Sequence, residues 1–420
     1  MKAKKLITSA ICLLLACSVT LGSGGCAVKL NAADLMEGIE SNRTGPVPEV
    51  EADSAAKAAD FAVRLFRQSA ESGKNTLISP LSVLAALSMT ANGAKGETLE
   101  QMEKVLGMNT DELNRFFLAY TDALPEGDKY KLSLANSIWF TSDERFTVVR
   151  DFLQTNADWY GADAFRAPFD GSTLKDINGW VKEKTDGMIP EILDKIPGEA
   201  VMYLVNALAF EAEWAETYKK DQVHEGEFTL EDGTKRTADF MYSSEGRYLY
   251  DGRAVGFIKY YSGQKYAFAA LLPNEGITVE DYVSSLDGES LTGMLAGAQN
   301  VPVDASVPKF ETGYGTEMSD VLKAMGMPAA FDDRYADFSG LGTSTDGNIY
   351  IDRVIHRTFI SVGEKGTRAG AATVVEMVDE AAIEFTDTKQ VHLDRPFVYM
   401  LIDTETNLPF FIGTMMDVNG

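Results

Sequence analysis

The sequence has 420 residues, of which 45% are hydrophobic and 10% aromatic, enough to bury one large core or two smaller ones. It carries 38 lysines and arginines against 63 acidic residues, a formal charge of −25 at pH 7. A field of that sign repels nucleic acids and anionic lipid headgroups, so neither is expected as a partner. The three cysteines, Cys12, Cys17 and Cys26, all precede residue 27, which excludes disulfides and thiolate sites from the rest of the chain.

The chain begins with a pattern typical of an export signal. Three lysines within Met1–Lys5 precede an apolar run from Leu6 to Leu21, so residues 1–25 are predicted to be a signal peptide. The sequence Ser23-Gly-Gly-Cys26 resembles a bacterial lipobox, in which the cysteine is acylated. We expect a bacterial protein held at the cell surface by lipid on Cys26, with plain secretion as the alternative. No later run is long and apolar enough to span a bilayer, so this lipid is the only membrane contact expected.

Residues 27–50 are predicted to be a flexible tether, because their polarity is mixed and they end in Arg43-Thr-Gly-Pro-Val-Pro48. The folded domain is then residues 51–420. Its first helix begins near Ala52, where apolar residues start to recur at helical intervals. A second helix follows Ser79-Pro80, a good cap and first residue, and ends at Asn92-Gly93. Further elements are predicted as helices over Thr98–Leu106, Asp111–Leu118 and Asp176–Lys184, and as a strand over Leu132–Phe140.

Beyond residue 200 strand patterns dominate. Because helices come first and strands later, without regular alternation, the sequence predicts an α+β fold with a mainly antiparallel sheet. Short helices are expected at Val279–Leu286 and Gly315–Met325. The predicted strands are Met202–Phe210, Gly226–Leu230, Thr237–Tyr242, Arg247–Tyr250, Val255–Tyr260, Tyr266–Pro273, Val301–Phe310, Arg353–Val362 and Phe397–Ile402.

The stretch from Glu364 to Glu380 has the pattern of a strand with no evident partner. At strand spacing one side carries small residues that grow in size along the chain, and the other side carries the charges of Arg368 and Glu376. Such a segment is able to join an existing sheet late, because no large side chain on the inward face blocks it. The inward set is Thr367, Ala369, Ala371, Thr373, Val375 and Met377.

No catalytic motif stands out. Of the three histidines, His224 is expected on the surface, His392 on a strand, and His356 buried and hydrogen-bonded within an apolar strand. The sequence has no Gly-X-Ser-X-Gly elbow, no His-Glu-X-X-His pair and no phosphate-binding glycine loop. We therefore expect no enzymatic activity, metal or cofactor. A hydrolase with an unrecognised Ser–His–Asp triad is the alternative.

Several runs in order resemble the serpins, a family of serine protease inhibitors, over residues from about 52 to 420. They begin with a pattern close to the family's second helix and close with two motifs near the carboxyl end. The quoted runs are Asn75-Thr-Leu-Ile-Ser-Pro-Leu-Ser-Val83, Asn92-Gly-Ala-Lys-Gly-Glu-Thr98, Ile177-Asn-Gly-Trp-Val181, Leu204-Val-Asn-Ala207 with Trp214, Val307-Pro-Lys-Phe310, Ala336-Asp-Phe-Ser-Gly340, Arg395-Pro-Phe397 and Pro409-Phe-Phe-Ile-Gly413.

The resemblance implies a fold of about nine helices and three β-sheets with an exposed reactive-centre loop. It also implies a metastable monomer that a serine protease attacks as a substrate, forming a covalent acyl-enzyme. The cleaved loop then inserts into the large sheet and traps the protease, so the inhibitor needs no active site of its own. The alternative within the family is a non-inhibitory member that acts as a protease substrate or a binding protein.

The resemblance assigns roles to individual residues. Counting seventeen residues from Glu364 places the reactive bond between Glu380 and Ala381, with Val378 and Asp379 as neighbours. The target is then a glutamyl-specific protease or, for a cut one or two residues away, an elastase- or subtilisin-like one. The hinge and first inserted residues are Glu364, Gly366, Thr367, Arg368, Ala369, Gly370, Ala371, Ala372 and Thr373, and the residues that control sheet opening are Ser79, Ser82, Asn206, His356 and, at the top, Trp214.

Two residues depart from the family pattern. Arg368 stands where an acidic residue is usual, and Gly370 replaces a common alanine. Both fall on the outward side at strand spacing, so insertion is expected to tolerate them.

Overall fold

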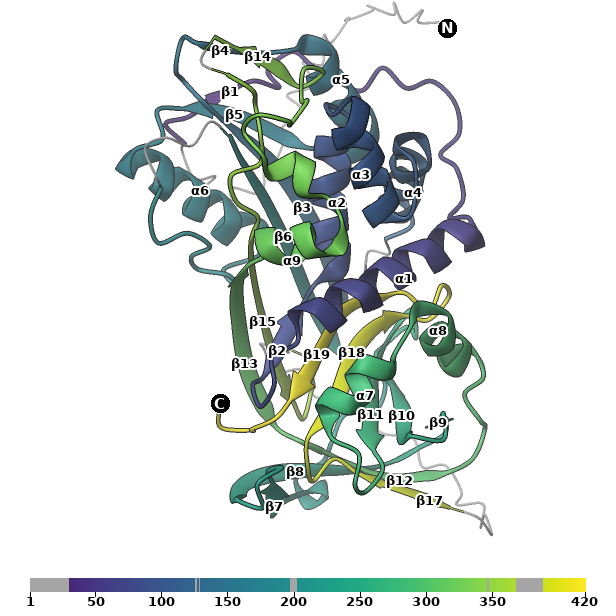
Figure 1. Ribbon diagram of the computed structural model, residues 1–420. Helices are drawn as coiled ribbons and strands as arrows, with labels where there is room; N and C mark the ends of the chain where they lie inside the picture. The colour runs from purple at the N-terminus through teal and green to yellow at the C-terminus, as the bar shows by residue number, and fades with distance from the viewer. Residues whose placement is uncertain (1–29, 125–126, 128, 197–201, 346, 368–387) are drawn as a thin grey trace, which may run out of the picture.

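The structure is a computed structural model that describes residues 30–124, 127, 129–196, 202–345, 347–367 and 388–420. Figure 1 shows a group of helices in front of the long strands β3 (Tyr130–Thr141) and β6 (Met202–Glu213), with two further sheets towards the opposite end. Among the described residues no helix is long and apolar enough to cross a membrane. The described part of the chain forms nine α-helices: α1 Ala52–Ser69, α2 Pro80–Ala91, α3 Gly96–Leu106, α4 Thr110–Asp122, α5 Arg150–Tyr160, α6 Gly171–Lys184, α7 Val279–Ser285, α8 Gly288–Ala296 and α9 Ser319–Met325.

Within the described ranges the largest sheet has seven strands, in the order β1-β5-β3-β6-β16-β15-β13. All its neighbouring pairs are antiparallel except β3 with β5. The strands in that order are Ala33–Asp34, Asp163–Ala167, Tyr130–Thr141, Met202–Glu213, Gly366–Thr367, Ile355–Gly363 and Phe310–Glu317.

Two further sheets and a small ribbon complete the described part of the fold, so the prediction of an α+β fold with three main sheets is confirmed. The six-stranded sheet is β2 Thr76–Ile78, β19 Pro409–Met415, β18 Phe397–Asp403, β11 Tyr266–Pro273, β10 Ala254–Tyr260 and β9 Tyr248–Tyr250. The four-stranded sheet is β17 Lys389–His392, β12 Val303–Pro308, β8 Lys235–Glu245 and β7 Val223–Thr229, and the ribbon is β14 Gly342–Ser344 with β4 Phe146–Val148.

The seven-stranded sheet is covered on both faces. Alternate residues of β6 enter two different apolar clusters: Met202 and Leu204 join the main core with α1 and α2, whereas Tyr203 and Val205 pack with Ile177 of α6. Side chains of a strand point alternately to opposite faces, so β6 has apolar neighbours on both. Helix α2 is itself buried at all twelve positions, which explains why its sequence is apolar all round.

Two predicted elements differ from the structure because tertiary pairing overrides the local pattern. The predicted helix Gly315–Met325 is wrong in its first part: the chain stays extended to Glu317, where β13 pairs with β15, and α9 begins only at Ser319. The predicted strand Val301–Phe310 is two strands separated at Lys309, one in the four-stranded and one in the seven-stranded sheet. Helix α5 and strand β5 were not predicted.

The segment from Leu30 to Val50, predicted to be a flexible tether, instead lies along the domain. Asp176 of α6 accepts hydrogen bonds from the backbone nitrogens of Asn31 and Ala32, each at 2.9 Å. Strand β1 pairs with β5, and the guanidinium of Arg43 lies 4.1 Å from the centre of the Trp159 ring. A buried carboxylate that accepts backbone N–H groups fixes a segment whose composition alone indicates a spacer.

Replacing Asp176 with alanine should loosen the start of this segment, at Asn31 and Ala32. Two backbone N–H groups lose a charged acceptor, which costs about 2 kcal/mol locally and speeds amide exchange of Asn31 and Ala32 about 30-fold. Hydrogen exchange measured by mass spectrometry checks the change. The matched control is Lys175→Ala, which alters the exposed neighbour and should leave exchange as in the wild type. Equal exchange in both variants would show that Asp176 does not hold the segment.

Candidate functional site

The short strand β16 occupies one end of the space between β6 and β15. Gly366 pairs with Gly363 of β15 and Glu213 of β6, and Thr367 pairs with Val362 and Ala212. Gly366 has a φ of +156°, and a Cβ at this position would lie 2.0 Å from the carbonyl oxygen of Ala212. Only glycine therefore fits where the chain turns from β15 into the sheet.

Below Thr367 the two flanking strands continue, and no described residue pairs with both of them. Among the described residues β6 and β15 are joined only through β16, and no direct ladder links them. We call the strip between β6 and β15 that runs on from Thr367 the slot. Unpaired strand edges can accept an added strand through main-chain hydrogen bonds.

Thr367 is buried at the mouth of the slot, with 2% of its surface exposed. Its hydroxyl forms a short hydrogen bond with that of Tyr261. The Tyr261 ring in turn stacks on Trp214, with 4.4 Å between ring centres and 8° between planes. This polar contact inside an aromatic cluster satisfies both hydroxyls without water.

Backbone contacts hold the turn that leads into β16. Trp214 donates its indole N–H to the carbonyl of Gly363 and its backbone N–H to the carbonyl of Lys365, both at 2.8 Å. The backbone N–H of Tyr218 donates to the carbonyl of Glu364. The Glu364 carboxylate lies 2.9 Å from the Lys309 ammonium, which holds the pKa of Glu364 below its usual value.

A buried lysine lies beneath the same cluster. The Lys259 ammonium is 2.9 Å from a carboxylate oxygen of Glu245 and 4.5 Å from the centre of the Tyr218 ring. Burial alone lowers the pKa of Lys259, but the influence of Tyr218 and Glu245 outweighs it and raises the pKa overall. The cation therefore stays charged beside the turn.

A second polar group lies further along the slot, on the helix side. His356 of β15 is buried, and its Nε2 accepts the backbone N–H of Ser79 at 3.0 Å. A nitrogen that accepts a hydrogen bond carries no proton, so the ring is neutral. Burial lowers the pKa of His356 to about 4, in agreement with that geometry.

The other residues assigned to sheet opening lie nearby. Ser82 is buried one turn along α2 from Ser79. Asn206 lies in β6, opposite Asn136 of β3. Thr367 pairs with Ala212 of β6 and with Val362 of β15, so these two residues lie at the same level on either side of the slot. Both strands run antiparallel to β16 and therefore in the same direction. Six residues back along each strand, Asn206 and His356 also lie at one level.

The structure thus brings the predicted site residues together in two groups. Glu364, Gly366, Thr367 and Trp214 meet at the mouth of the slot. Ser79 and His356 are bonded beside it, with Ser82 buried on the same helix. The remaining predicted residues lie outside the described ranges: Cys26, Arg368, Ala369, Gly370, Ala371, Ala372, Thr373, Val378, Asp379, Glu380 and Ala381.

Four residues of the mouth were not identified from the sequence: Tyr218, Lys259, Tyr261 and Lys309. Lys309 lies within the run Val307-Pro-Lys-Phe310, one of the motifs visible in the sequence. The sequence did not show that Lys309 pairs with Glu364. Lys259 interrupts an apolar strand, which marks it as a buried charge that needs a partner. Nothing local distinguishes Tyr261 from a core tyrosine.

The neutral state of His356 predicts a loss of stability in mild acid. Between pH 6.5 and 4 the unfolded chain binds a proton at this histidine and the folded chain does not, so the free energy of unfolding falls as the pH falls. The full loss is about 3 kcal/mol. Urea unfolding at pH 7.5 and 4.5 measures it. His356→Gln should have a shallower pH dependence, and the exposed control His224→Gln should keep the wild-type one. Equal slopes in all three proteins would refute the assignment.

Known proteins with similar sequences and folds agree with this arrangement of sheets and helices. Residues 56–418 match the profile of the serpin (serine protease inhibitor) family. A serpin-like protein of Thermococcus kodakarensis is 29% identical over 364 residues, which cover 85% of this chain and 84% of that protein. The leukocyte elastase inhibitor of Equus caballus is 29% identical over 374 residues, covering 84% and 96%.

A solved structure extends the likeness to three dimensions. The thermophilic serpin tengpin in its native state has a TM-score of 0.87 and 46% identity, covering 92% of this chain and 99% of that one. Its latent state has a TM-score of 0.79 and 43% identity, covering 89% and 100%. Since the family profile spans most of the chain and the fold agrees, this chain belongs to the serpin family.

Proposed function

We propose that this protein inhibits an extracellular serine protease by trapping it as an acyl-enzyme, with the cleaved loop inserted into the slot. The observation that carries the proposal is the placement of Gly366 and Thr367 between β6 and β15, ahead of strand edges that share no ladder among the described residues. The greater likeness to native than to latent tengpin supports an arrangement in which insertion has not yet run its course.

The register of β16 predicts which residues of β6 the inserted loop would pair with. Thr367 faces Ala212, and in an antiparallel pair each step along the loop moves the partner one residue back along β6. Met377, ten residues on, would face Met202, the first residue of β6. An inserted strand from Thr367 to Met377 spans about 35 Å. A protease attached just beyond it would be carried that distance along the sheet.

The alternation of side chains along a strand supports the fit of the inserted loop. Thr367 faces the main core, so Ala369, Ala371, Thr373, Val375 and Met377 would face it too. These residues are small at the start and larger towards the end, as the sequence shows. Thr373 would lie at the level of Asn206 and His356, and Arg368 would lie on the opposite face at the level of Glu211, where a charge is tolerated.

The composition of the loop supports the proposed target class. A cut after Glu380 suits a glutamyl-specific protease, and a cut after Val378 or Ala381 suits an elastase- or subtilisin-like one. The sequence has no lysine or arginine between Thr373 and Thr388, so no trypsin-like target is proposed. We place the inhibitor outside the cell, as a lipoprotein anchored at Cys26 or as a secreted protein, and as a monomer, on the strength of its signal pattern and mechanism.

Mixing the protein with pancreatic elastase should give a covalent complex that survives denaturing electrophoresis. The acyl-enzyme persists because insertion separates the catalytic groups faster than deacylation proceeds. Mass spectrometry of the released peptide should place the cut within two residues of Glu380. A control with the protease inactivated beforehand should give no complex.

Other outcomes decide between the rival functions. Cleavage without a complex would identify a non-inhibitory substrate, and turnover of small esters by the protein alone would identify a hydrolase. A cut after lysine or arginine would overturn the proposed target class. Cleavage of the loop should also raise the melting temperature, because the inserted strand completes the hydrogen-bonded ladder of the large sheet. An unchanged melting temperature would contradict a metastable uncleaved state.

Replacing Thr367 with arginine should convert the inhibitor into a substrate. The side chain at this position is buried against Tyr261, and an unpaired buried charge would stall insertion at its first step. The number of inhibitor molecules consumed per trapped protease should rise about tenfold or more, measured by titration against elastase. Thr367→Ser keeps the hydroxyl and should inhibit, as should Thr345→Arg at an exposed position. Full inhibition by Thr367→Arg would mean that insertion does not depend on a small, uncharged side chain at residue 367.

A further inference from the structure

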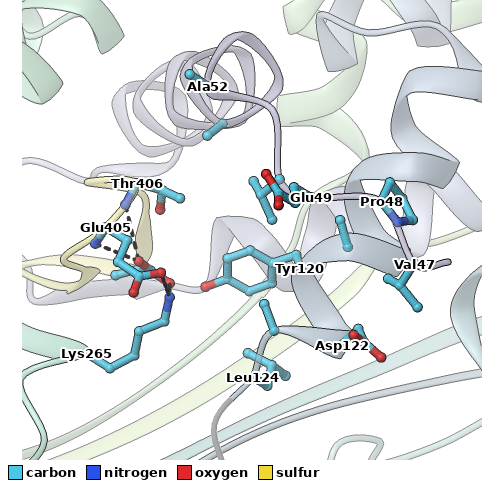
Figure 2. A pocket seen from close by; sticks show the side chains of 15 residues that line it. Val47, Pro48, Glu49, Ala52, Tyr120, Asp122, Leu124, Lys265, Glu405 and Thr406 are labelled. Atoms are coloured by element: carbon cyan, nitrogen blue, oxygen red, sulfur yellow. Dashed lines mark hydrogen bonds and ion pairs between the residues drawn. The ribbon is translucent and has the colours of Figure 1, made fainter.

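A cavity of about 510 Å³ lies away from the slot, between the start of α1, the end of α4 and the turn that joins β18 to β19 (Figure 2). Its volume is in the range of small-molecule sites. One wall is the end of the amino-terminal segment, which lies along the domain. The apolar part of the lining is Val47, Pro48, Val50, Ala52, Ala55, Ala119, Ala123 and Leu124.

Acidic groups dominate the polar part of the lining. Glu49, Asp122, Asp403 and Glu405 carry four carboxylates, and Lys265 is the one lysine among the described lining residues. The Lys265 ammonium is already paired, at 3.0 Å to Asp403 and 2.6 Å to Glu405. Its charge is therefore compensated inside the cavity, and the surplus is negative.

Tyr120 supplies an independent sign of a missing partner. Only 2% of this residue is exposed, and among the described residues its hydroxyl has no hydrogen-bond partner. Figure 2 shows that the phenol oxygen points towards the group formed by Lys265 and Glu405. Buried hydroxyls are nearly always hydrogen-bonded, so this atom marks a place where a donor or acceptor is expected.

We propose that this cavity binds a small organic cation, a primary ammonium on a compact apolar body. The ammonium would donate to the Tyr120 oxygen and to Oε1 of Glu405, because Lys265 is bonded to Oε2, and the carboxylates of Glu49 and Asp122 would supply the surplus negative charge. The apolar body would rest on the alanines and valines of α1 and the amino-terminal segment. An anion of the same size is disfavoured by the surplus of carboxylates, and a neutral molecule leaves that charge unmatched.

Isothermal titration of the full chain with phenethylamine tests the proposal. Saturable binding at one site is expected, about tenfold or more tighter than binding of the neutral phenethyl alcohol or the anionic phenylpropionate. Added salt should weaken the binding of the amine. No saturable binding of the amine, or equal affinity for the three compounds, would overturn the proposal. The titration contains no protease, so its result is independent of whether the protein is an inhibitor.

Variants locate the site. Tyr120→Phe removes only the hydroxyl oxygen, and Glu405→Gln removes a charge from an exposed side chain, so both should fold. Each should weaken amine binding about tenfold. The matched control Glu275→Gln changes an exposed acid in another loop and should bind as the wild type does. Unchanged affinity in both Tyr120→Phe and Glu405→Gln would refute a site in this cavity.

Discussion

The pairing of Gly366 and Thr367 with both β6 and β15 is the constraint on which the rest of the site depends. Among the described residues, β16 is the part of the chain that pairs with both strands. In the proposed mechanism, insertion would continue from β16 along the slot, because backbone N–H and C=O groups strongly favour pairing. The aromatic contact of Thr367 with Tyr261 and the bonds of Trp214 to the turn fix where that insertion starts.

The covering of the large sheet restricts how another strand can arrive. Residues of β6 pack against the main core on one face and against α6 on the other. A strand entering between β6 and β15 therefore comes from the end of the sheet, residue by residue, and its inward side chains meet the core in turn. In the proposed mechanism, small residues therefore suit the leading positions of the loop, and the buried His356, which accepts the backbone N–H of Ser79, presents a neutral group beside the slot.

Long periodic segments were predictable because their own side chains determine their conformation. The helices at Ala52–Ser69 and Pro80–Ala91 follow the apolar spacing and the cap pattern that the sequence shows. The helix expected over Gly315–Met325 was wrong in its first part, because pairing with β15 keeps the chain extended to Glu317. The described part of the amino-terminal segment contacts the domain through residues far apart in the sequence, among them Asp176, strand β5 and Trp159, and local composition does not show such contacts.

By itself the sequence determined the fold class and most of the long helices and strands, and it predicted the inward set of the loop and the residues of the hinge. These follow from periodicity and from motifs, which are properties of neighbouring residues. Only the tertiary structure decided that Thr367 is bonded to Tyr261, that Lys309 pairs with Glu364, and that Tyr120 faces a cavity with an acidic lining. Each joins residues far apart in the chain, and such contacts depend on how the sheets and helices pack rather than on local spacing.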